Sequence, residues 1–215
     1  MSQDTSLAAI PADSLILKSY LALGDSYTIG QSVPEMARFP LQTVSMLLHD
    51  NILFAPPEII ARTGWTTGNL LNAIDITPPQ KLSYDVVSLL IGVNNQYQHL
   101  NPAQYKDEFT ILLNKAIQLA GNKKNHVFVL SIPDYGVTPF ANGLDTAEIA
   151  AEIDEFNAIN KSITLTNGCS YIDITALSRL AASYPTLVAG DGLHPSGDEY
   201  NKWALLLSKA ISLAL

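Results

Sequence analysis

Five short apolar segments typical of strands recur along the chain, and they constrain the fold more than any other feature. They are SYLALG at 19–24, EIIAR at 58–62, DVVSLLIG at 85–92, HVFVLSI at 126–132 and SYIDI at 170–174. Their apolar residues are nearly continuous rather than alternating with polar ones, which predicts strands covered on both faces. Stretches with helical spacing separate them. The alternation predicts a three-layer α/β fold with a parallel sheet and right-handed crossovers.

Three polar residues mark predicted helix starts. Asn101 stands directly before Pro102, which suits the first position of a helix. Asp145 and Ser196 are each followed three residues later by a glutamate, in position to meet the free amide groups of a first turn. Helices are therefore expected to begin after all three.

Composition favours one globular unit and excludes several partners. The chain has 215 residues, of which 47% are hydrophobic and 15% charged, without a low-complexity linker or an internal repeat, so residues 1–215 are expected to form a single domain. The formal net charge is −8 and no stretch clusters Lys and Arg, so nucleic acid and anionic membrane surfaces would be repelled. Cys169 is the only cysteine, which excludes an internal disulfide framework and a cysteine-rich zinc site.

No targeting or membrane-spanning segment is visible in the sequence. The first twenty residues lack the basic start, long apolar core and small-residue cleavage site of a secretory signal. The chain as written is therefore expected in the cytoplasm; a periplasmic or secreted protein whose signal had been removed would look the same. Apolar runs such as residues 86–92 are far too short to cross a bilayer.

Candidate functional residues follow the ends of the predicted strands. In open parallel sheets the working site lies outside the carboxyl ends of the strands, where loops and helix starts converge. The residues in such positions are Ser26, Gly64, Asn94, Asp134, Asp191 and His194.

Ser26 could be a nucleophile, but the sequence Gly-Asp-Ser is also common in turns. A nucleophilic serine needs a base to take its proton. His194 is the best candidate because Asp191 lies three residues earlier across a glycine and could hold the imidazole in one tautomer. The pentapeptide DGLHP could also be only a turn and a helix entrance. The remaining histidines suit surface or structural positions: His49, His99 and His126.

Acyl transfer also requires hydrogen-bond donors for the developing oxyanion. Asn94 offers a side-chain amide after a central strand, and Gly64 would let a backbone N–H approach a substrate closely. Each alone is typical of a turn. Asp25, next to Ser26, is expected to point away from the site and to bind loop amides.

These residues together resemble the SGNH, or GDSL-type, hydrolase superfamily. Its short blocks occur in order: GDSY at 24–27, the glycine at 64, GVNN at 92–95 and DGLHP at 191–195. The resemblance spans about residues 19–213. Tyr27 stands where the family name has Leu, and Asn95 where Asp is commoner, so the departures bear on substrate preference more than on chemistry.

The resemblance implies a flavodoxin-like α/β/α sandwich with a Ser26, His194, Asp191 triad. It also implies an oxyanion hole formed by the amides of Ser26 and Gly64 and the side chain of Asn94. The expected reaction is hydrolysis of a carboxylic ester through an acyl-enzyme, with no metal or cofactor.

The substrate is expected to be a short-chain or sugar-acetyl ester, because the chain has no long apolar stretch that could form a lipid-interface lid. A lysophospholipase- or thioesterase-type acylhydrolase is the alternative. The loop 132–140, which carries Tyr135 and Phe140, could form a wall of the substrate pocket together with Trp65 and Tyr97 from neighbouring loops. These aromatic residues could equally be ordinary core.

Three other classes compete with an esterase. A flavodoxin-like phosphate-binding module would use the loop 24–30, but this loop lacks a Gly-Lys-Ser/Thr motif and carries the negative charge of Asp25. A metal-dependent phosphohydrolase could use Asp25, Asp134 and Asp191. A non-catalytic binding relative is the third, although every predicted catalytic position holds a competent residue.

Overall fold

A computed structural model describes residues 17–215, so the expectation about a secretory signal concerns a segment almost entirely outside the described residues. The strands and α-helices, in chain order, are β1 Tyr20–Gly24, α1 Ser26–Ile29, α2 Phe39–His49, β2 Glu58–Ala61, α3 Thr67–Ile76, β3 Val86–Leu90, α4 Val93–Tyr97, α5 Pro102–Leu119, β4 Val127–Leu130, α6 Thr146–Thr166, β5 Ser170–Ile172, α7 Thr175–Ser178 and α8 Gly197–Ala214. Short 3₁₀ turns connect several of them: Glu35–Ala37, Lys124–His126, Tyr135–Val137, Pro139–Ala141, Arg179–Ala182 and Pro185–Leu187.

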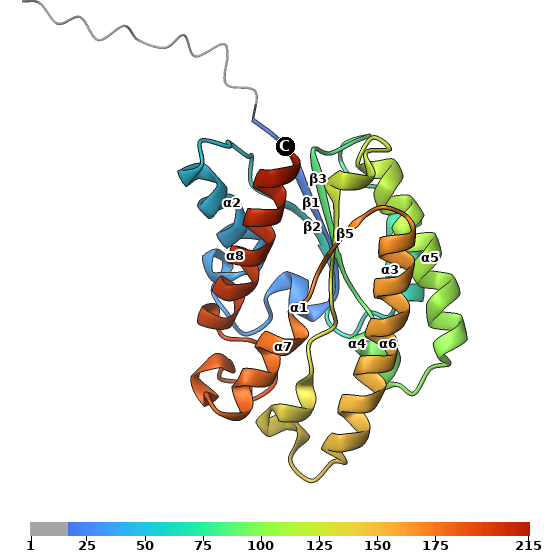
Figure 1. Ribbon diagram of the computed structural model, residues 1–215, viewed down its shortest axis with the longest axis vertical. Helices are drawn as coiled ribbons and strands as arrows, with labels where there is room; N and C mark the ends of the chain where they lie inside the picture. The colour runs from blue at the N-terminus through green and yellow to red at the C-terminus, as the bar shows by residue number, and fades with distance from the viewer. Residues whose placement is uncertain (1–16) are drawn as a thin grey trace, which may run out of the picture.

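The five strands form one parallel sheet in the order β2-β1-β3-β4-β5. This is the flavodoxin-like order, in which β2 lies on one side of β1 and the later strands β3, β4 and β5 follow on the other side. Each strand lies within the segment predicted for it. Because all strands run the same way, their carboxyl ends meet at one edge of the sheet, and the short helices α1, α4 and α7 lie at that end of the molecule (Figure 1).

Helices cover both faces of the sheet, which gives the predicted α/β/α sandwich. Figure 1 shows α2 and α8 on one face and α3, α5 and α6 on the other. Within these layers α2 packs against α8, and α5 packs against both α3 and α6. No helix among residues 17–215 has the length and apolar character needed to cross a bilayer.

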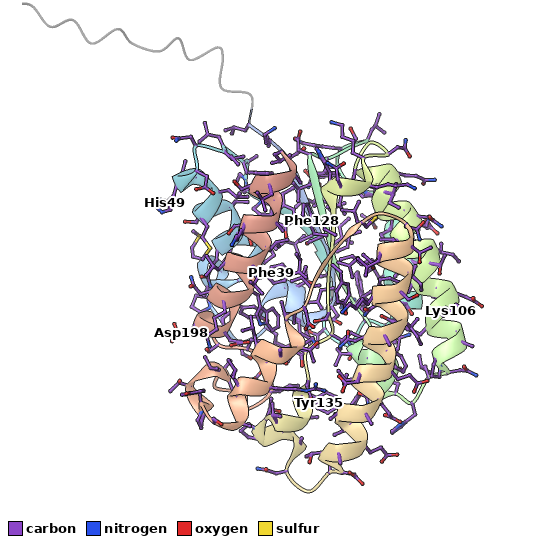
Figure 2. The ribbon with its side chains drawn as sticks, viewed as in Figure 1. Phe39, His49, Lys106, Phe128, Tyr135 and Asp198 are labelled. Carbon is purple, nitrogen blue, oxygen red and sulfur yellow. The ribbon has the colours of Figure 1, made fainter. Side chains whose placement is uncertain are left out.

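The core lies on both sides of the central strands. Every residue of β1, β3 and β4 is buried, whereas the edge strands β2 and β5 are mostly half-buried. Figure 2 shows Phe39 and Phe128 in the interior, while His49, Lys106 and Asp198 point outward. Burying one such large apolar side chain contributes about 1.5–3 kcal/mol, so the central strands form a rigid base for the loops at their ends.

The three predicted helix starts are confirmed. Asn101 before α5, Asp145 before α6 and Ser196 before α8 each accept a backbone N–H from the first turn, at 2.8, 3.0 and 3.4 Å respectively. The structure differs at Glu199, which does not bind the amides of its first turn. Its buried carboxylate accepts the indole N–H of Trp203 instead, at 2.8 Å, because the core offers that unpaired donor.

Candidate active site

An acid–base pair occupies the loop before α8. The Oδ2 atom of Asp191 lies 2.6 Å from Nδ1 of His194, and Oδ1 accepts the backbone N–H groups of Leu193 and His194, each at 3.0 Å. Gly192 between them has φ +75°, a conformation that favours glycine and lets the loop fold back on itself. Since Nδ1 is bound to the carboxylate, Nε2 is left available for another partner.

Hydrogen bonding keeps Asp191 ionised. Desolvation acts to raise the pKa of its carboxyl group, but hydrogen bonds from Ser32 Oγ, the Leu193 amide and His194 outweigh it. The pKa therefore lies well below the ordinary value for an aspartic acid. A carboxylate that stays charged can orient the buried His194 ring and stabilise its protonated form.

Ser26 is the first residue of α1 and is separated from the end of β1 only by Asp25. It lines a cavity of about 110 Å³, here called the Ser26 cavity, together with His194 and Asn94. Among residues 17–215 no hydrogen bond joins Ser26 Oγ to His194. The structure thus brings the two side chains to one cavity without a hydrogen bond between them. Hydrogen bonds between a nucleophile and its base are often long when no substrate is bound.

Glycine at position 24 is needed for packing. A Cβ atom there would lie 2.4 Å from the carbonyl oxygen of Leu90 and 2.1 Å from Thr28 Oγ1. Its φ is not in the left-handed region, so the close approach of β3 and α1 is the constraint. A side chain at this position would therefore disturb the end of β1, two residues before Ser26.

Asp25 has the structural role expected from the sequence. Its side chain is buried and Oδ1 accepts the backbone N–H of Tyr27 at 3.0 Å, which caps α1. Burial raises the pKa of this carboxyl group to about 7, with the Tyr27 amide acting in the opposite direction. The ring of Tyr27 packs in turn against the His194 ring, with 5.2 Å between centroids.

Of the three predicted oxyanion donors, Ser26 and Asn94 line the Ser26 cavity and Gly64 does not. The Ser26 N–H begins a helix and so has no intrahelical acceptor. Asn94 lines the Ser26 cavity, and its Nδ2 donates to the carbonyl oxygen of Trp65 at 2.9 Å, which orients the amide. Its second N–H has no acceptor within residues 17–215. Gly64 has φ +79° on an exposed turn after β2, and it is not among the residues that line this cavity.

Asn95, in α4, connects the segment after β3 to the start of α3. Its buried side-chain amide donates to Thr67 Oγ1 at 2.7 Å and accepts the Thr67 backbone N–H at 3.0 Å. Thr67 begins α3, directly after the Gly64 turn, and its hydroxyl also donates to Glu108. An amide supplies the donor and the acceptor that this contact requires, which gives a physical reason for Asn at this position.

Aromatic side chains form one wall of the Ser26 cavity. The rings of Tyr97, Tyr135 and Phe140 lie about 6 Å apart pairwise, and all three line the cavity. Tyr135 is buried at the strand-end side of the molecule, as Figure 2 shows. Trp65, another aromatic singled out in the sequence, packs half-buried against the core and does not line the cavity.

A second, larger cavity of about 450 Å³ adjoins this wall and is here called the α6 cavity. Tyr97 and Tyr135 line both cavities. Three carboxylates, Asp145, Glu148 and Glu152, contribute to the lining of the α6 cavity. The site therefore combines a small apolar chamber beside Ser26 with a wider acidic one.

Asp134 is used in the scaffold. Its buried carboxylate accepts from Arg179 Nε at 2.9 Å and from the Gly136 amide at 2.8 Å. With Asp25 capping α1 and Asp191 holding His194, each carboxylate of the alternative metal site has another partner. No group of three or more His, Cys, Asp or Glu residues suited to a metal ion occurs between residues 17 and 215.

Sequence reasoning missed several residues of the site. Tyr27, Val93 and Leu193 also line the Ser26 cavity, and Ser32 Oγ donates to Asp191 at 2.6 Å. The first three are the direct neighbours in sequence of Ser26, Asn94 and His194, so proximity in sequence could have found them. Nothing local marks Ser32.

Comparison with known proteins gives one family. A model of the GDSL-like lipase/acylhydrolase family matches residues 22–201, which include Ser26, Gly64, Asn94, Asp191 and His194. None of the curated proteins compared with the chain matches its sequence.

Solved structures share the fold at low sequence identity. TesA superposes with a TM-score of 0.72 at 15% identity, over 92% of this chain and all (100%) of that one. The lipase Lip_vut3 from a goat rumen metagenome has a TM-score of 0.71 at 20% identity, over 90% and 97% of the two chains. The psychrotrophic esterase EstA from Pseudoalteromonas sp., in a structure inhibited by monoethylphosphonate, has a TM-score of 0.66 at 16% identity, over 91% and 97%.

Proposed function

Since the chain belongs to the GDSL-like lipase/acylhydrolase family, we propose that it is a serine esterase that cleaves short-chain or sugar-acetyl esters through an acyl-enzyme. One observation carries the proposal: a histidine bound to a carboxylate at 2.6 Å shares a cavity with a serine hydroxyl. A base oriented by an acid beside a hydroxyl nucleophile is the arrangement that serine acyl transfer needs.

In the proposed mechanism, His194 Nε2 takes the proton of Ser26 Oγ as this oxygen attacks the ester carbonyl carbon. Asp191 keeps the ring oriented and stabilises its positive charge. When the tetrahedral intermediate collapses, the bond to the alcohol oxygen breaks, and His194 returns the proton to the leaving alcohol. Water then attacks the acyl-enzyme with His194 again as the base, which releases the carboxylic acid and restores Ser26.

The oxyanion would be stabilised by the Ser26 amide, the free N–H of Asn94 and the Gly64 amide. The bond from Asn94 to the Trp65 carbonyl supports this role, because a preoriented donor needs no reorganisation during the reaction. One such donor is worth about 3–4 kcal/mol of the barrier. Gly64 lies outside the cavity lining, so its participation would require its turn to approach the bound ester.

The size of the Ser26 cavity favours a short acyl group. Its volume of about 110 Å³ is well below the roughly 300–1,000 Å³ of pockets that enclose drug-sized ligands. Apolar side chains from the aromatic wall, Val93 and Leu193 make up most of its lining, which suits a methyl or a short alkyl chain.

The α6 cavity favours an alcohol portion that is neutral and rich in hydroxyls. Asp145, Glu148 and Glu152 can accept hydrogen bonds from hydroxyl groups. The same carboxylates, in a chain of formal net charge −8, would repel a phosphate-bearing leaving group. A sugar ester therefore fits this side better than a lysophospholipid or an acyl thioester of a nucleotide-bearing thiol.

Hydrolysis of p-nitrophenyl acetate, butyrate and octanoate and of acetylated oligosaccharides tests the proposal. Wild type is expected to prefer acetate and to release acetate from the sugars, whereas Ser26→Ala and His194→Ala should lose kcat by at least about a thousandfold. A phosphonate ester should label Ser26 in the wild type only. Activity that persists in Ser26→Ala would refute the mechanism, and a preference for octanoate would favour the lysophospholipase- or thioesterase-type alternative.

A further inference from the structure

The loop after α1 connects three parts of the site. Gly30 and Gln31 both donate their backbone N–H groups to the carbonyl oxygen of Ser26. Gln31 Oε1 accepts from Thr63 Oγ1 at 2.6 Å, on the turn that carries Gly64. The next residue, Ser32, reaches Asp191 across a separation of 159 positions in the sequence.

Ser32 binds the oxygen of Asp191 that also binds the histidine. Its Oγ donates to Oδ2 at 2.6 Å, and the same Oδ2 accepts from His194 Nδ1 at 2.6 Å. The other oxygen, Oδ1, is occupied by two backbone amides of the Asp191 loop. Within the described part of the chain, Ser32 is therefore the donor to Asp191 that comes from outside the loop 191–194.

We propose that Ser32 is a positioning residue, which holds the Asp191 carboxylate in the orientation that binds His194. The inference rests on the proposed esterase function and adds a residue to its machinery. The side chain of Asp191 is 27% exposed, so without Ser32 water could take its place and the carboxylate could rotate about its side chain. Ser32 also links this acid through a short loop to the backbone of the nucleophile.

The backbone of Ser32 supports a requirement for its hydroxyl. Its φ is +68°, in the left-handed region that glycine adopts without strain and other residues seldom do. Glycine would therefore be the unstrained choice if only the turn mattered. The chain instead carries the one-carbon hydroxyl side chain that reaches Asp191.

This conformation provides a test that separates the hydroxyl from the turn. Ser32→Gly removes the hydroxyl and relieves the backbone, whereas Ser32→Ala removes the hydroxyl and keeps the strain. Asn122→Gly is the matched control, because Asn122 also has a positive φ, +62°, and lies in the turn after α5, away from the residues that line the Ser26 cavity. All variants are assayed with p-nitrophenyl acetate and by the rate of phosphonate labelling of Ser26.

We expect kcat to fall about five- to tenfold in both Ser32 variants, with KM within about twofold of wild type. Ser32→Gly should be at least as thermostable as wild type, and Asn122→Gly should keep full kcat. In an Asp191→Ala background, Ser32→Gly should cause no further loss, because the residue acts through Asp191. Phosphonate labelling should slow in parallel.

Full kcat in Ser32→Gly, or losses that multiply in the Asp191→Ala background, would overturn the inference. These outcomes are distinct from a failure of the proposed function. If Ser26→Ala and His194→Ala remain active, the esterase mechanism itself is wrong. If those variants are inactive and Ser32→Gly is fully active, only the role of Ser32 is wrong.

Discussion

Replacing Asp25 with Asn is expected to change how the stability of the protein depends on pH. Burial raises the pKa of this carboxyl group from 3.8 to about 7, although the Tyr27 amide partly opposes it. Between these two pH values the folded protein holds a proton that the unfolded chain has lost. Stability therefore falls as the pH rises from about 4 to 7, and the full penalty is present above pH 7.

The magnitude follows from the two pKa values. A tenfold change in proton affinity corresponds to about 1.4 kcal/mol, so a pKa of about 7 instead of 3.8 corresponds to roughly 4 kcal/mol at pH 8. Asn resembles the protonated acid in shape, and its Oδ1 can still accept the Tyr27 amide. Asp25→Asn should thus be about as stable as wild type near pH 4 and more stable by up to roughly 4 kcal/mol at pH 8.

Urea unfolding of both proteins at intervals from pH 4 to pH 8, followed by tryptophan fluorescence, measures this difference. Asp134→Asn is the control, because Asp134 is equally buried but its carboxylate is paired with Arg179. That variant should be less stable than wild type at neutral pH, since it leaves the guanidinium without this partner. If Asp25→Asn and wild type differed by the same amount at every pH, the burial argument would be wrong.

Three further substitutions test other parts of the site. Asn94→Ala should lower kcat about 10²- to 10³-fold with KM little changed, measured on p-nitrophenyl acetate; an unchanged kcat would remove Asn94 from the oxyanion site. Tyr97→Ala should shift the ratio of acetate to butyrate hydrolysis with little loss of stability, because the residue is 49% exposed. A lower melting temperature with an unchanged ratio would contradict a pocket role. Asn95→Ala should lower the free energy of unfolding by about 2–3 kcal/mol, since it leaves Thr67 without two buried hydrogen bonds, and urea unfolding at pH 7 measures the loss.

The helix starts and strands were predictable because their signals are local. The apolar run at 85–92 contains β3, and Asn101 before Pro102 caps α5 through an amide two residues away. The same applies to the Asp191–His194 pair, since three residues across a glycine bring the carboxylate to Nδ1. Glu199 shows the limit of such reasoning. Its position predicts a contact with the amides of the helix start, but its carboxylate accepts the indole N–H of the buried Trp203 instead.

The sequence by itself determined the order of the strands and helices, the contact between Asp191 and His194, and the strand ends at which polar residues would collect. Only the tertiary structure decided which of those residues meet. In the folded protein Ser26 and His194 line one cavity, and Trp65 lies outside it. The hydroxyl of Ser32 donates a hydrogen bond to Asp191. The reason is physical: capping and apolar patterning depend on neighbours along the chain, whereas contacts between loops depend on how the layers pack on the whole sheet.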